Sequence, residues 1–138
     1  IRISKPDRSW YVGDMKILLV DDNADVRMTL AAMLSRLGYE VTSVESAEAA
    51  FERLAANPID LILSDYNLPD VDGVELLRRA NGMVPGLVSI IASGIAPPGH
   101  WDHIDDWLIK PLPFGELKHR LEAAVAKRED QRTADGFG

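Results

Sequence analysis

The chain has 138 residues, of which 46% are hydrophobic and 27% charged, and it contains no cysteine. This length and apolar content predict one globular domain with a core, and they exclude two domains, wholesale disorder and low-complexity chains. Without cysteine the chain has no disulfide, thiolate metal site or cysteine nucleophile. The net charge of −7, with no basic patch, argues against direct nucleic-acid binding.

The N-terminal residues and the apolar runs carry information about targeting. The apolar runs at residues 17–20 and 87–92 are far shorter than the ~20 residues of a membrane-spanning helix, so no membrane insertion is expected. Residues 1–10 are charged and no apolar segment follows them, so we expect no secretory signal and a cytoplasmic location. Residues 1–14 show no strand or helix periodicity and are interpreted as a linker, an arm or a vector-derived extension.

From residue 15 onward, short apolar runs alternate with amphipathic segments. We predict strands at residues 16–20, 40–44, 59–64, 87–92 and 107–109. The first, third and fourth are almost continuously apolar, which is typical of strands covered on both faces.

Helices are predicted between these strands. Apolar residues at positions 26, 30, 33, 34 and 37 share one helix face, and Gly38 follows as the stop signal. A second helix covers residues 47–54 and ends before Pro58, a third starts after Asp72, and a last one starts at Pro113. The alternation predicts an α/β fold, a doubly wound parallel sheet over residues 15–128, followed by a polar tail at residues 129–138.

Polar side chains follow four of the five predicted strands. Asp21 and Asp22 follow the first, Asp65 the third, Ser93 the fourth and Lys110 the fifth. Parallel strands end at one edge of the sheet, so we expect these groups to lie close together. Three carboxylates in one place repel one another unless a cation is present, and oxygen ligands are what Mg²⁺ prefers.

A lysine and a hydroxyl beside such a metal site suit the binding of a phosphoryl group, because both offset charge on its oxygens. One carboxylate is then the candidate acceptor of an acyl phosphate. Asp65 is central in the predicted sheet and is our candidate.

The segments ILLVDDN, LILSDYNLPDVDGVELL, SIIASG and WLIKP resemble the signature blocks of response-regulator receiver domains. The similarity covers roughly residues 15–127 and implies a flavodoxin-like five-stranded parallel sheet in the order 2-1-3-4-5. It further implies that Asp65 is the phosphoacceptor. The metal ligands it implies are Asp21, Asp22, Asp65 and the backbone carbonyl of Asn67, with Mg²⁺ as the cofactor.

The resemblance also assigns the remaining groups at the strand ends. Ser93 takes the family's Ser/Thr switch position, Lys110 contacts the phosphoryl group, and Trp107 takes the aromatic switch position. The Lys110–Pro111 peptide bond is expected to be cis, as it commonly is in this family.

One segment departs from the family pattern. Only 110 − 93 = 17 positions separate Ser93 from Lys110, and Pro97-Pro98 with flanking glycines opposes helix formation. The fourth helix of the family is therefore predicted to be short or replaced by a loop.

These observations predict a phosphorelay receiver that takes a phosphoryl group from a cognate histidine kinase or histidine phosphotransfer protein and switches a partner-binding surface. It is a stand-alone regulator or the receiver of a hybrid histidine kinase, and its fold allows a homodimer. As a switch it is not an enzyme, since it catalyses only its own phosphorylation and dephosphorylation. One alternative is an aspartyl-phosphate phosphohydrolase, although Asn67 stands where those enzymes carry a proton-transferring aspartate. Another is a phosphorylation-independent interaction domain.

Other polar residues are given structural interpretations. Asp70 and Asp72 are expected to serve as loop and cap residues, and Asn23 or Asp22 to cap the first helix. The acidic run of Asp102, Asp105 and Asp106 is interpreted as a solvated loop, and the three histidines as surface residues.

Overall fold

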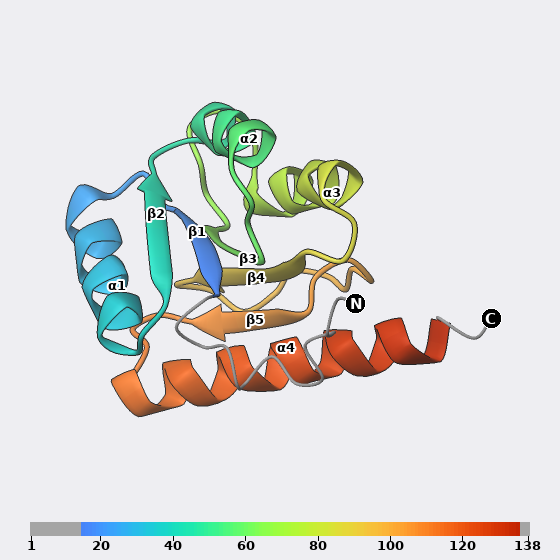
Figure 1. Ribbon diagram of the computed structural model, residues 1–138. Coiled ribbons are helices and arrows are strands. Elements are labelled where there is room, and N and C mark those ends of the chain that lie inside the picture. Colours follow the sequence, from blue (N-terminus) through green and yellow to red (C-terminus); the bar gives the residue numbers. More distant parts are fainter. Residues whose placement is uncertain (1–14, 136–138) are drawn as a thin grey trace.

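The fold is a single parallel sheet between two layers of helices (Figure 1). The computed structural model describes residues 15–135, with side chains described through residue 131. The strands are β1 (Lys16–Val20), β2 (Glu40–Val44), β3 (Leu61–Asp65), β4 (Val88–Ser93) and β5 (Asp106–Ile109), in the order β2-β1-β3-β4-β5. The helices are α1 (Ala24–Arg36), α2 (Ala47–Ala56), α3 (Gly73–Met83) and α4 (Phe114–Asp135). This is the predicted flavodoxin-like doubly wound sheet.

Each face of the sheet has its own apolar core because successive strand residues point to opposite faces. Ile17 and Leu19 pack with residues of α1 and α4 on one face. Leu18 and Val20 pack with residues of α2 and α3 on the other. Figure 1 shows α2 and α3 together on one side of the sheet. The near-continuous apolar character of β1, β3 and β4 follows from this two-sided burial.

Local capping explains where the helices begin. The side chains of Asn23, Ser46 and Asp72 accept hydrogen bonds from backbone N–H groups three residues later, at 3.0, 3.1 and 2.8 Å. Each therefore satisfies one of the N–H groups that a helix start leaves unpaired. Asn23, rather than Asp22, caps α1.

The end of α1 confirms the predicted stop signal. Gly38 has a φ of 98°, a left-handed conformation that glycine adopts without steric cost. Tyr39 N–H donates to the carbonyl of Leu34 and Gly38 N–H to that of Ser35, which is the Schellman arrangement.

The connection between β4 and β5 contains no helix in the structure, which describes all of residues 94–105. This confirms the prediction that the family's fourth helix is short or replaced by a loop, and the C-terminal helix therefore carries the label α4 (Figure 1). Residues 94–100, which include Pro97 and Pro98, are all exposed. Proline removes a backbone donor and clashes with the preceding turn of a helix, which accounts for the irregular conformation.

The C-terminal helix is longer than the sequence pattern indicated. Residues from 129 onward were predicted as a polar tail, but α4 continues to Asp135. Four of the seven residues at 129–135 are Glu, Gln, Arg and Ala, which all favour helix. The predictions for residues 1–14 and 136–138 lie outside the described residues. Among residues 15–135, no helix is both long and apolar enough to cross a membrane.

Candidate functional site

Three aspartates meet at the carboxyl edge of the sheet, where β1 and β3 end side by side. Val20 pairs with Ser64 in the parallel register, so Asp21 and Asp65 occupy the next neighbouring positions. One carboxylate oxygen from each of Asp21, Asp22 and Asp65 lies within 4.8 Å of the other two. Asp21 is buried, Asp65 half-buried and Asp22 exposed, so the cluster opens to solvent on one side.

Lys110, directly after β5, completes the cluster. Its Nζ lies 2.7 Å from Asp21 Oδ2 and 3.5 Å from Asp65 Oδ1. Its backbone N–H donates to the carbonyl of Ser93 at 2.8 Å, which fixes where the side chain leaves the sheet. The Lys110–Pro111 peptide bond is cis, as expected.

Opposing influences act on the Asp65 carboxyl. Burial raises its pKa, and the charge of Asp21 adds to that effect. The ammonium of Lys110 and the backbone N–H groups of Tyr66 and Asn67 act against it, and the net result is a raised pKa. A further positive charge beside Asp65 would therefore stabilise its ionised form.

Arg27 is a neighbour of the site that the sequence interpretation missed. Its Nη1 donates to the backbone carbonyl of Asp21 at 2.7 Å, which ties α1 to the end of β1. The Asp21 Oδ1 atom also accepts from the N–H of Asn23 at 2.9 Å. The sequence did contain a signal for this contact, since Arg27 is a basic residue near the start of the helix that follows Asp21 and Asp22.

Ser93 and Trp107 meet through one loop residue. The Ser93 Oγ accepts from the N–H of Ile95 at 3.3 Å, and Trp107 Nε1 donates to the carbonyl of Ile95 at 2.9 Å. Trp107 also lies between two rings, with centroids 5.4 Å from Tyr66 and 6.1 Å from Trp101. Ser93 itself is buried at the end of β4, and its hydroxyl bonds the start of the exposed loop through Ile95.

The acidic residues near β5 correct one of our interpretations. Only Asp102 is fully exposed, whereas Asp105 pairs with Arg128 at 2.9 Å and Asp106 with Arg120 at 2.7 Å. The Asp105 side chain is 3% exposed. The interpretation as a solvated acidic loop is therefore wrong for Asp105 and Asp106, which attach α4 to the edge of the sheet. The local sequence could not reveal these ion pairs because both arginines belong to the following helix, α4.

The residues present suit a divalent cation. The three carboxylates and the single ammonium leave a charge of −3 + 1 = −2 at the edge of the sheet. The candidate ligand atoms are all oxygens, which Mg²⁺ prefers, and the exposed side leaves room for water ligands. Together, fold and site define a flavodoxin-like α/β domain whose strand ends can hold a metal and an anion.

Comparison with known proteins shows which family of flavodoxin-like domains this chain resembles. Residues 17–122 match the family model of the response regulator receiver domain. The response regulator receiver protein CpdR of Brucella abortus (strain 2308) is 40% identical over 112 residues, which cover 78% of this chain and 93% of CpdR. The sensor histidine kinase RcsC of Salmonella typhi is 35% identical over 120 residues, which cover 83% of this chain but only 13% of the kinase.

A crystal structure of a receiver domain shows the same fold as this chain. The signal receiver domain of an HD domain-containing protein from Pseudomonas fluorescens Pf-5 superposes with a TM-score of 0.77 at 29% identity, covering 84% of this chain and 98% of that one. The chain belongs to the response regulator receiver domain family, the signalling switches of two-component systems.

Proposed function

We propose that this receiver accepts a phosphoryl group on Asp65 from a phosphohistidine of a histidine kinase or phosphotransfer protein, with Mg²⁺ as cofactor. The observation that carries the proposal is the grouping of three carboxylates within 4.8 Å around a lysine that reaches both Asp21 and Asp65. Asp21, Asp22, Asp65 and the carbonyl of Asn67 would hold the ion. When bound, Mg²⁺ supplies positive charge that offsets charge on the phosphoryl oxygens.

The transfer itself is a simple displacement. A carboxylate oxygen of Asp65 attacks phosphorus, an O–P bond forms as the P–N bond of the phosphohistidine breaks, and the electron pair passes to the imidazole nitrogen, which takes a proton from solvent. Lys110 offsets charge on the phosphoryl oxygens. The Ser93 hydroxyl accepts rather than donates in its hydrogen bond with Ile95, so its own proton is available for a phosphoryl oxygen.

The switch output runs through the loop that replaces the missing helix. Ile95 joins the two switch residues, since its N–H bonds Ser93 and its carbonyl bonds Trp107. A movement of Ser93 toward a phosphoryl group on Asp65 would pull on Ile95 and thereby on the Trp107 indole. The exposed residues 94–100 are the surface that changes.

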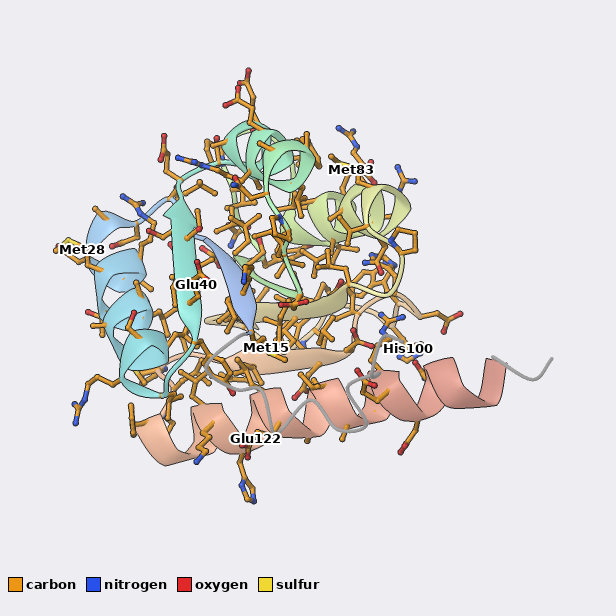
Figure 2. All side chains as sticks on the ribbon, viewed as in Figure 1. Met15, Met28, Glu40, Met83, His100 and Glu122 are labelled. Atoms are coloured by element: carbon orange, nitrogen blue, oxygen red, sulfur yellow. The ribbon has the colours of Figure 1, made fainter. Side chains whose placement is uncertain are left out.

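A groove beside the acceptor suits the phosphodonor. It has a volume of about 470 Å³ and lies between α1 and the start of the β5–α4 connection, with Val26, Leu30 and Met33 on one wall and Lys110 to Leu112 on the other. Lys110 belongs to both the groove and the acceptor cluster, so a helix seated there would bring its phosphohistidine next to Asp65. Met28, 69% exposed, projects from α1 into solvent (Figure 2) and adds apolar surface for the same partner.

Amide NMR spectra recorded with beryllofluoride and Mg²⁺ test the phosphoacceptor assignment. Beryllofluoride mimics an acyl phosphate, so we expect shifts at Asp65, Ser93 and Lys110 in the wild type and none in Asp65→Asn. An unchanged wild-type spectrum would remove the basis of the proposal.

The donor groove has its own test. Thr29 is exposed and lines the groove, so Thr29→Arg should slow phosphotransfer from a protein donor but not from acetyl phosphate. Ser35→Arg, an exposed position near the far end of α1, is the matched control. Equal rates for both variants with the protein donor would place the partner elsewhere.

A further inference from the structure

The first turn of α2 is capped from two separate parts of the chain. Ser46 supplies one cap, because its Oγ accepts from Ala49 N–H at 3.1 Å, and its carbonyl accepts the first intrahelical bond from Ala50 N–H at 3.0 Å. The N–H groups of the first two helical residues, Ala47 and Glu48, donate to the carboxylate oxygens of Asp70 at 3.1 and 2.9 Å. Three N–H groups that a helix start leaves unpaired are thus satisfied, two of them by a residue from the β3–α3 connection.

The segment that contains Asp70 also contains the residues that follow the proposed phosphoacceptor. It begins at Tyr66, whose carbonyl accepts from Gly73 N–H at 2.7 Å and so closes the connection into a loop. The N–H groups of Tyr66 and Asn67 act on the Asp65 carboxylate at one end of the loop. At the other end, Asp70 Oδ1 accepts from Val71 N–H at 3.1 Å in addition to its bond with α2.

Asn67 therefore lies between two attachment points. On one side the chain is held by Asp65, and on the other by the Asp70 carboxylate on α2. Asn67 itself is exposed, so burial of its side chain contributes little to holding this part of the loop. Leu68 and Val71 pack only partly against the core of α2 and α3, which leaves the Asp70 hydrogen bonds as the polar attachment of this half of the loop.

We propose that Asp70 is a positioning residue of the magnesium site: by capping α2 it holds the loop that presents the Asn67 carbonyl. This proposal rests on the function proposed above and adds to it a residue that touches neither the metal nor the phosphoryl group. Although burial opposes the effect, the N–H groups of Glu48, Ala47 and Val71 hold the pKa of Asp70 below its usual range, so the carboxylate is ionised at neutral pH. Charged caps at a helix N-terminus are also favoured by the helix dipole.

Magnesium titration by calorimetry of the intact chain tests the proposal. Removing a residue that orients a metal ligand commonly costs at least tenfold in metal affinity, so Asp70→Ala is expected to raise the Kd for Mg²⁺ about 10-fold. Ser46→Ala is the matched control because it removes a cap from the same turn of α2 without releasing the loop. Both variants should lower the melting temperature, but only Asp70→Ala should weaken Mg²⁺ binding.

The possible outcomes separate this inference from the proposed function. A wild type that binds no Mg²⁺ would overturn both. Wild-type binding with equal affinity in Asp70→Ala, or equal weakening in Ser46→Ala, would overturn the positioning role alone. Should Asp70→Ala fail to fold, Asp70→Asn carries the test, because the NH2 that replaces one carboxylate oxygen cannot accept, and one of the two bonds to α2 is lost. Weaker Mg²⁺ binding supports the proposal and unchanged binding contradicts it.

Discussion

Gly73, the first residue of α3, lies against the backbone of the proposed phosphoacceptor. A Cβ atom added there would stand 2.3 Å from the carbonyl oxygen of Asp65 and 2.9 Å from Ile91 Cδ1. Ordinary contacts begin at 3.4 Å, so β3 and α3 would have to separate by about 3.4 − 2.3 = 1.1 Å at this point. The Ile91 side chain can rotate, but the Asp65 carbonyl moves only with its strand.

Gly73→Ala should therefore damage both stability and the site. Overpacking of this kind costs about 1–3 kcal/mol of unfolding free energy. A displacement of about 1 Å in a reacting group can cost on the order of 100-fold in rate, and we expect a loss of that size in phosphorylation by acetyl phosphate.

Urea unfolding and phosphorylation rates measure the two effects of Gly73→Ala. Gly82→Ala is the control, because Gly82 lies in the same helix and an added Cβ meets nothing within 4 Å. The control should be stabilised by about 0.5 kcal/mol and phosphorylated at the wild-type rate. If Gly73→Ala behaved like Gly82→Ala, the close approach of α3 to Asp65 would be refuted.

Three further predictions concern the rest of the domain. Burial and a neighbouring carboxylate raise the pKa of Tyr39 to about 12, against about 10 in the unfolded chain. Neutral Tyr39 therefore stabilises the folded state by up to about 3 kcal/mol relative to a tyrosine that has ionised in the unfolded chain. This contribution is complete below pH ~10 and is lost as the pH rises toward 12. Tyr39→Phe should flatten the loss of stability between those pH values in urea unfolding, and an unchanged slope would contradict the burial argument. Asp105→Ala leaves Arg128 without its buried partner and should cost about 3 kcal/mol in the same assay; a cost below about 1 kcal/mol would show that the pair is not desolvated. Trp107→Phe removes the hydrogen bond to Ile95 and should speed amide hydrogen exchange in residues 94–100 without changing the affinity for Mg²⁺. Unaltered exchange would contradict the role of Ile95 in linking Ser93 to Trp107.

The fold and the cluster at the strand ends were predictable because their signals are local. Asp21-Asp22 and Asp65 stand at the ends of two largely apolar strand patterns, and parallel connectivity then brings those ends together. The missing helix was predictable for the same reason, since Pro97 and Pro98 act on their own backbone.

The interactions that escaped prediction join residues that are far apart in sequence. Asp105 meets Arg128 23 positions later, and Asp70 reaches the first turn of α2 22 or 23 positions earlier. Each depends on how a helix packs against the sheet, which no local pattern contains. The continuation of α4 was hidden in a similar way, because a polar helix end and a polar tail have the same composition.

The most direct test of the account is to locate the phosphoryl group. The wild type is phosphorylated with Mg²⁺ and acetyl phosphate, the acyl phosphate is reduced with borohydride, and the peptides are sequenced by mass spectrometry. We predict that Asp65 is converted to homoserine, that the conversion requires Mg²⁺, and that Asp65→Asn shows none. Modification at another residue, or none in the wild type, would contradict the assignment of Asp65 as the phosphoacceptor.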